Sequence, residues 1–366
     1  MAEELRKSVF NEELITHLSD AFSREMSSFD KQAFHELVFQ QDWEDLGLKE
    51  RMRRITLSMH EVLPGDYKEA LYILYKVAPT VGGLQGTIFP DYVELYGLND
   101  WEASIKALAF FTPFSTSEFG VRPFLIQDKN RMLQQMIEWA GDENHHIRRL
   151  ASEGSRPRLP WGQSVPELKQ DPKQTLPILE QLKRDESLYV RKSVANHLND
   201  ISYIEKDWML DVMKKWYGKD VKTDWIVKHA CRSLLKKGDP EALSLFGYGD
   251  DPGVSVTELS LQPHTITIGD SIDFSFELSV EKTMPLRIEY GIHYVKAKGN
   301  RTQKVFMLKN VQAKAGQTLT VTKKHAFKDL STRKHYSGTH TLSVIVNGVV
   351  KAEADFVIEQ RLKKLF

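Results

Sequence analysis

The feature that most constrains the fold is a short pattern that recurs at a spacing close to 40 residues. DENHHIRR at 142–149 is echoed 43 residues later by DESLYVRK at 185–192. VKHA at 227–230 repeats the tail of the pattern after 37 more residues, and SIKA at 104–107 matches it 42 residues before the first copy. This period is typical of HEAT-like repeats, whose helix pairs stack because one pair cannot bury its apolar face alone. We therefore predict a helical solenoid.

Apolar residues at helical spacing extend this prediction over residues 1–246. Breaks between helices are expected at Pro64 with Gly65 and at Gly82 with Gly83. The clearest helices are predicted at 11–26, 31–39, 48–62 and 66–77.

The pattern changes after residue 246. A turn-rich stretch, GYGDDPG at 247–253, precedes alternating polar and apolar residues such as SIDFSFEL at 271–278. Asn347 and Gly348 are typical of a two-residue hairpin. About seven short strands in this part predict an immunoglobulin-like β-sandwich. The expected organisation is an α-solenoid of HEAT-like repeats at 1–246, a linker at 247–253 and the β-sandwich domain at 254–366.

Composition restricts the possible classes. The chain has 366 residues, of which 41% are hydrophobic and 27% charged, a balance typical of globular proteins. It has no apolar run long enough to span a membrane, its acidic start lacks the core of a secretory signal, and Cys231 is its one cysteine. We expect a cytoplasmic monomer without disulfide bonds or membrane contact.

The net charge of zero hides an uneven distribution. Residues 1–140 carry 14 Lys and Arg against 22 Asp and Glu, whereas 141–237 carry 19 against 14 and 238–366 carry 17 against 14. Two basic sections that follow an acidic one suit an anionic partner bound by one face. Uneven charge is also common on helical proteins, so the pattern alone does not identify the partner.

Three segments carry polar and aromatic residues that a plain repeat does not need. The first, FSTSEFGVRPF at 114–124, places Glu118 between a Ser/Thr turn and an apolar stretch. The spacing is equally compatible with a capping box, in which Ser115 or Thr116 begins a helix and Glu118 closes the box.

The second segment, ASEGSRPRLPWG at 151–162, is expected to end a helix at Glu153 and to continue as a loop stiffened by two prolines. Such a loop presents Arg156, Arg158 and Trp161 with little conformational entropy to lose on binding. The alternative is a tryptophan packed between repeats.

The third segment, YVRKSVANHLND at 189–200, is a predicted helix with an apolar stripe at one side and Lys192 at the other. Asp200 lies at its C-terminal end, where the helix dipole disfavours a carboxylate. Either this acid belongs to a site or it is an ordinary surface acid.

Other kinds of site are not indicated. The twelve histidines show no ligand spacing with the cysteine, so no metal site is expected. The phosphate-binding motifs GxxxxGK[ST] and GxGxxG before a helix, and the nucleophile motif GxSxG, do not occur. The sequence therefore predicts neither a metal nor a cofactor.

Together these segments resemble the AlkC-type DNA alkylation repair glycosylases, a family of the HEAT-like repeat superfamily with a branch that carries a C-terminal immunoglobulin-like domain. The resemblance is carried by SEFGVRPF at 117–124, ASEGSRPRLPW at 151–161 and VRKSVANHLNDIS at 190–202. It implies hydrolysis of the N-glycosidic bond of cationic bases, such as 3-methyladenine and 3-methylcytosine in duplex DNA, without a closed base-flipping pocket.

The resemblance also implies roles for individual residues. Asp200 would stabilise the developing sugar cation and place water, Glu118 and Glu153 would contact sugar or base, and Trp161 would contact the deoxyribose. Contacts to DNA would come from Arg156, Arg158, Arg191, Lys192, His197 and Lys228.

Two alternatives remain at this point. One is a binder of bent or damaged DNA that performs no catalysis, and the other is a protein–protein scaffold. Three carboxylates facing a phosphate-rich ligand do not suit the first, because they repel phosphate. The Arg-Pro-Arg-Leu-Pro-Trp loop has no evident use in the second.

Overall fold

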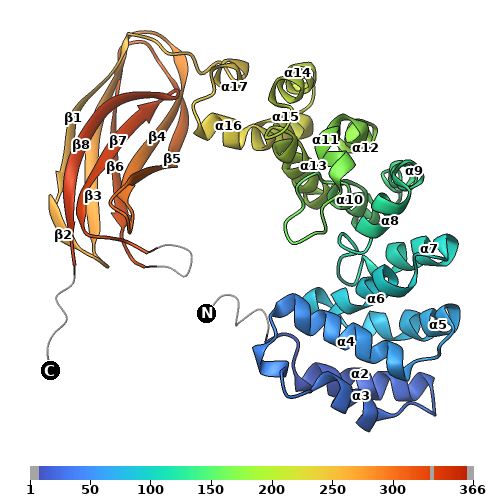
Figure 1. Ribbon diagram of the computed structural model, residues 1–366. Helices are drawn as coiled ribbons and strands as arrows, with labels where there is room; N and C mark the ends of the chain where they lie inside the picture. The colour runs from blue at the N-terminus through green and yellow to red at the C-terminus, as the bar shows by residue number, and fades with distance from the viewer. Residues whose placement is uncertain (1–7, 330–333, 361–366) are drawn as a thin grey trace, which may run out of the picture. The chain divides into compact units, whose positions relative to one another are not determined.

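The structure, a computed structural model, describes residues 8–329 and 334–360. The chain divides into two compact units, which we call the helical unit (Met1–Ala230) and the β unit (Cys231–Phe366). The helical unit is built from stacked helices and the β unit from two short helices and a β-sandwich (Figure 1). This confirms the predicted fold class. The contacts group the helices at 232–245 with the strands, whereas the domain boundary that we predict falls at 246, and that boundary stays a prediction.

The helices of the helical unit follow one another with short connections. Their bounds are α2 (Glu12–Glu25), α3 (Lys31–Val38), α4 (Leu48–Val62), α5 (Tyr67–Val77), α6 (Ile88–Tyr96), α7 (Trp101–Phe111), α8 (Arg122–Gln127), α9 (Lys129–Trp139), α10 (His145–Gly154), α11 (Pro166–Gln170), α12 (Leu176–Leu182), α13 (Leu188–Ile201), α14 (Lys206–Trp216) and α15 (Val221–Ala230). None of the described helices is long and apolar enough to cross a membrane.

Short polar side chains define many of the helix starts. In each case an Asp or Asn at the N-cap accepts a hydrogen bond from a backbone N–H of the first turn, a group with no partner inside the helix. These N-caps are Asn11, Asp30, Asp66, Asp100, Asp128 and Asn144.

The sequence repeat corresponds to a repeated local structure. Before α10 the backbone carbonyls of Asp142 and Glu143 accept hydrogen bonds from Arg148, and before α13 Arg191 donates to two carbonyls in the same way. Arg148 also forms a two-pronged ion pair with the Asp185 carboxylate, at 2.6 and 3.0 Å. The motif therefore ties each loop to its own helix, and Arg148 joins one repeat to the next.

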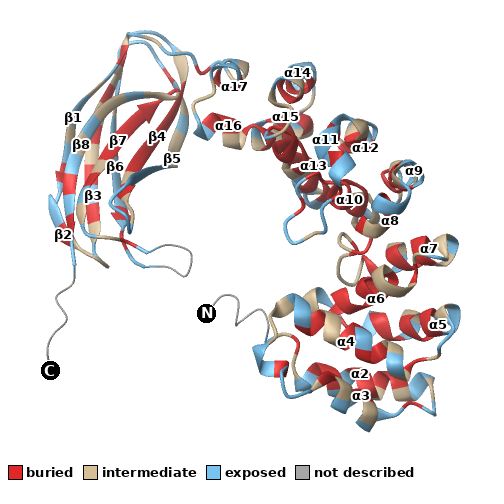
Figure 2. Cartoon of the chain, in the orientation of Figure 1, coloured by how far each residue is buried: buried red, intermediate tan, exposed pale blue. Residues whose placement is uncertain are grey.

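Helices α10, α13 and α15 pack in succession, α10 against α13 and α13 against α15 (Figure 1). Helix α13 is buried on most of its circumference, not only along the predicted apolar stripe (Figure 2). Polar residues on this helix are therefore placed inside the protein.

In the β unit, α16 (Arg232–Lys236) and α17 (Pro240–Leu245) precede two sheets. One sheet has the order β1-β3-β6 and the other β2-β8-β7-β4-β5, with antiparallel pairing except between β2 and β8. The strands are β1 (Val254–Gln262), β2 (Thr265–Thr267), β3 (Ser271–Val280), β4 (Met284–Val295), β5 (Arg301–Ala313), β6 (Gln317–Ala326), β7 (Gly338–Val346) and β8 (Val349–Glu359).

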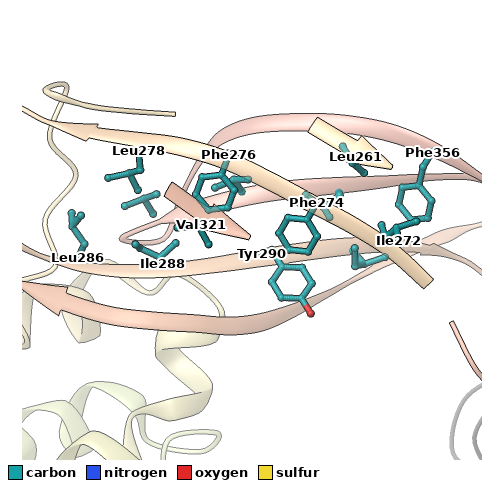
Figure 3. Packing of buried hydrophobic residues seen from close by; sticks show 14 of the residues in the cluster. Leu261, Ile272, Phe274, Phe276, Leu278, Leu286, Ile288, Tyr290, Val321 and Phe356 are labelled. Atoms are coloured by element: carbon teal, nitrogen blue, oxygen red, sulfur yellow. The ribbon is translucent and has the colours of Figure 1, made fainter. Parts of the chain in front are cut away.

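The alternating residues of the strands form the core of the β unit. Phe274, Phe276 and Leu278 lie at every second position of β3 and are fully or almost fully buried (Figure 3). The predicted hairpin connects β7 and β8, and Asn347 and Gly348 both have positive φ, at 50° and 81°.

Candidate active site

Three carboxylates and two guanidinium groups form a linked set in the helical unit. We call this set, Glu118, Arg149, Glu153, Arg156 and Asp200, the acid–arginine cluster. Arg156 donates from Nε and Nη2 to the two oxygens of Asp200, at 2.8 and 3.1 Å, and from Nη1 to Glu153 Oε1 at 2.5 Å. Arg149 Nη1 lies 2.9 Å from Glu118 Oε2, and its Nη2 lies 3.8 Å from Glu153 Oε1. The structure thus brings together the three acids that the sequence singles out.

The cluster is close to the surface but largely buried. The exposed fraction of its side chains runs from 7% for Glu153 to 16% for Arg149. Burial raises the pKa of Asp200, while its hydrogen bond and ion pair with Arg156 act in the opposite direction. The three carboxylates of the cluster face its two guanidinium groups and the buried charge of Arg122, which interacts with Asp200 and Arg156, in an environment that screens poorly.

Helix geometry sets the positions in this cluster. Arg149, Glu153 and Arg156 belong to α10 and the residues that follow it, at spacings of four and three that place them on one side. Asp200 lies in the last turn of α13, which packs against α10. A carboxylate is tolerated at this helix C-terminus because the guanidinium group of Arg156 offsets the unfavourable interaction with the helix dipole.

Glu118 does not form the capping box that the sequence leaves open. Helix α8 begins at Arg122, so Glu118 lies in the turn before it rather than in its first turn. Thr116 Oγ1 donates to Glu118 Oε2 at 2.8 Å, which fixes the carboxylate that Arg149 contacts.

Sequence reasoning missed Arg149 and Arg122. The four-residue separation of Arg149 from Glu153 on a predicted helix is the signal that could have found the first. Arg122 is 1% exposed and donates to the carbonyl oxygens of Gly154 (2.9 Å), Arg156 (2.7 Å) and Gln163 (2.8 Å). Burial lowers the pKa of Arg122 to about 10. Through its three hydrogen bonds, the Arg122 side chain fixes both ends of the loop that follows α10.

Trp161 lies in this loop with an exposed side chain. Its residue is 53% exposed and has a left-handed backbone, with φ of 64°. Lys49 Nζ donates a hydrogen bond to its carbonyl oxygen. A tryptophan packed between repeats, which is the alternative that the sequence leaves open, would be buried. The exposure of Trp161 therefore argues against that alternative.

Two of the residues expected to contact DNA are buried inside the protein. His197 is fully buried, its Nδ1 donates to the carbonyl of Ser152 (2.9 Å), and its Nε2 lies 3.0 Å from the hydroxyl oxygen of Thr175. Burial lowers the pKa of His197 to about 3, so the ring is neutral. Arg156 is buried and engaged by two carboxylates, which leaves it inside the cluster rather than against a phosphate.

The other expected contacts lie further out. Arg191 is half-buried and holds the loop before α13. Arg158, Lys192 and Lys228 are exposed, and the guanidinium carbon of Arg158 lies 4.3 Å from the centre of the Tyr203 ring. The roles of these residues in DNA binding stay predictions. Among the described residues, no group of three or more His, Cys, Asp or Glu side chains could hold a metal ion.

The comparisons with known proteins agree with this architecture. Residues 112–234 match the family model described as "DNA alkylation repair enzyme", and residues 255–360 match the model described as "Uncharacterised protein YhaZ, C-terminal Ig-like domain". The chain is 53% identical to the uncharacterized protein YhaZ of Bacillus subtilis (strain 168), over 96% of this chain and 99% of that protein.

Among solved structures, the chain resembles the Pseudomonas fluorescens alkylpurine DNA glycosylase AlkC bound to DNA containing an abasic site analog. The two share 39% sequence identity with a TM-score of 0.94, over 97% of this chain and 99% of that chain. Matches of this identity and coverage establish kinship over both units. The chain therefore belongs to the AlkC family of DNA alkylation repair proteins.

Proposed function

We propose that this protein is a DNA glycosylase that hydrolyses the N-glycosidic bond of cationic alkylated bases in duplex DNA, such as 3-methyladenine and 3-methylcytosine, and leaves an abasic site. The observation that carries the proposal is the acid–arginine cluster, in which three largely buried carboxylates lie together close to the surface and are held in place by guanidinium groups. The likeness to a glycosylase of known structure supports the same reading.

The chemistry requires little from the protein at the leaving base. An N3-alkylated base is already positively charged, so the electron pair of the C1′–N bond neutralises it as it departs. Positive charge then develops on the deoxyribose, as in glycoside hydrolysis. Water adds to C1′ and loses a proton, which completes the hydrolysis. Carboxylates beside the sugar stabilise this transition state more than the ground state.

The size of the expected effect follows from Coulomb's law. One negative charge about 5 Å from a developing positive charge, at an effective dielectric constant of about 20, contributes about 3 kcal/mol. That corresponds to roughly a hundredfold in rate. We assign the main electrostatic contribution and the placement of water to Asp200, and contacts with sugar or base to Glu118 and Glu153.

Arg156 has a positioning role in this proposal. Its fork holds both oxygens of Asp200 and one of Glu153, which fixes the carboxylates before DNA binds. Trp161 contacts the deoxyribose with its exposed ring, and Arg158, Arg191, Lys192 and Lys228 contact the DNA backbone. The reaction as proposed uses no metal, no cofactor and no closed pocket for a flipped base.

The test is release of free 3-methyladenine and 3-methylcytosine from methylated duplex DNA, measured by mass spectrometry in the presence of a metal chelator. We expect release of at least one of these bases together with an equal amount of abasic sites. Duplex binding without base release, by a preparation shown to be folded, would instead support a binder of damaged DNA that performs no catalysis. Binding that weakens steeply as salt concentration rises distinguishes either from a protein scaffold.

A further inference from the structure

Tyr189 lies beside the acid–arginine cluster and has no role in the reaction proposed for it. It is the second residue of α13 and is 39% exposed. The guanidinium carbon of Arg149 lies over its ring, 4.7 Å from the ring centre. Arg149 belongs to α10, which packs against α13 (Figure 1). The contact therefore connects a member of the cluster to the next repeat of the solenoid.

Two histidine rings contact the Tyr189 ring as well. The ring centres of His145 and His146, in the first turn of α10, lie 6.1 and 5.6 Å from that of Tyr189, at interplanar angles of 79° and 67°. Such edge-to-face contacts are a favoured arrangement of aromatic rings. Burial, together with the neighbouring His145 and Arg149, lowers the pKa of His146, so this imidazole is neutral at pH 7. The ring of Tyr189 is thus fixed against α10, and Arg149 is the cation at its face.

Arg149 links two carboxylates of the cluster. Its Nη1 lies 2.9 Å from Glu118 Oε2 and donates to Thr116 Oγ1 at 3.3 Å, and its Nη2 lies 3.8 Å from Glu153 Oε1. The face of a tyrosine ring attracts a cation, and the attraction is larger where water is excluded. The Arg149 side chain is only 16% exposed, so the ring contributes to holding the guanidinium group in one position.

We propose that Tyr189 is a positioning residue, whose ring holds the guanidinium group of Arg149 between the two carboxylates that this group contacts. Without the ring the guanidinium group has more freedom, and the two acids, which repel each other, lose their fixed positions. The consequence for base excision rests on the proposed function, whereas the hold on Arg149 rests on the contacts of the ring alone.

The experiment compares single-turnover release of 3-methyladenine from methylated duplex DNA by the wild type, Tyr189→Leu and Tyr189→Phe. We expect Tyr189→Leu to be about tenfold slower, because the attraction between the ring and the guanidinium group is lost. Tyr189→Phe keeps the ring and should restore the rate. Binding to an abasic-site duplex should be retained in both variants, because Tyr189 acts on the carboxylates and not on DNA.

Two further substitutions separate this role from packing. Tyr72→Leu is the matched control, because Tyr72 is also exposed and has a cation at its face, Lys76 Nζ at 4.4 Å, but lies on α5. Its rate should equal that of the wild type. Pentafluorophenylalanine incorporated at position 189 keeps the shape of phenylalanine and reverses the charge at the ring face, so it should slow release although packing is kept. It also keeps the test decisive if Tyr189→Leu does not fold.

Arginine side-chain NMR of the full-length protein without DNA tests the contact independently of activity. The ring current should shift the Nε–H signal of Arg149, identified with Arg149→Lys, and this shift should persist in Tyr189→Phe and disappear in Tyr189→Leu. An unchanged signal or an unchanged rate in Tyr189→Leu would overturn the inference, as would a loss of duplex binding as large as the loss of rate. A wild type that releases no base refutes the proposed function alone, since the NMR comparison still tests the hold on Arg149.

Discussion

Replacement of Arg122 by methionine should destabilise the loop that follows α10. The side chain donates three hydrogen bonds to backbone carbonyl oxygens, those of the buried residues Gly154 and Arg156 and that of the exposed Gln163. Hydrogen bonds from a charged donor contribute about 1.5–3 kcal/mol each, so their loss costs about 4.5–9 kcal/mol in total. The lowering of the Arg122 pKa from 12.5 to about 10 shows that burial disfavours its charge, and a neutral side chain recovers about 3 kcal/mol of that penalty. The free energy of unfolding is therefore expected to fall by about 2–6 kcal/mol.

Hydrogen–deuterium exchange of the peptide spanning residues 154–163 measures this effect locally, and urea denaturation measures it for the whole chain. We expect faster exchange throughout that peptide and a lower urea midpoint. Arg131→Met is the control, because the Arg131 side chain is 51% exposed and its ion pair with Glu102 is worth at most about 1 kcal/mol. Unchanged exchange at 154–163 in Arg122→Met, or a loss of stability no greater than in Arg131→Met, would refute the reasoning.

Three further predictions concern single residues of the helical unit. Because the pKa of His197 falls to about 3 in the folded protein from 6.5, its contribution to stability should be lost as the pH drops from about 6.5 towards 3, and urea titrations of His197→Leu should lack that component. The pKa of Asp91 is raised to about 6 from 3.8, so the folded state binds this proton more tightly and stability should fall by about 3 kcal/mol as the pH rises from about 4 to 6. The same titration of Asp91→Asn should show no such decline, and an identical decline would contradict the raised pKa. Trp161→Ala should change the free energy of unfolding by less than about 1 kcal/mol, since the ring is exposed, yet slow base release about tenfold; an equal rate would remove Trp161 from the site.

The fold was largely predictable because both periodicities are strong. The repeat of about 40 residues corresponds to pairs of helices. The alternation of polar and apolar residues at 271–278 corresponds to strand β3. Strand β5 (Arg301–Ala313) is less marked in the sequence because it is rich in polar residues and mostly exposed or half-buried, so apolar residues do not alternate along it.

The candidate site was predictable in part. The unfavourable position of Asp200 at a helix end marked it as a candidate site residue, but the sequence could not show that Arg156, 44 residues earlier, is its partner. His197 lies beside the apolar stripe of α13 in a helical projection, seven residues after Val190 and four before Ile201, so its burial agrees with helix geometry. The sequence could not show that Thr175, from the turn before α12, and the carbonyl of Ser152 contact its ring nitrogens, because such contacts follow only from tertiary packing.

The most direct test of the central claim is the single-turnover rate of 3-methyladenine release from methylated duplex DNA by the wild type and by Asp200→Asn. Asparagine keeps the shape of the side chain and removes the charge, so the account predicts a rate about a hundredfold lower with binding to an abasic-site duplex retained. An Asp200→Asn enzyme that is folded and releases the base as fast as the wild type would contradict electrostatic stabilisation by this carboxylate.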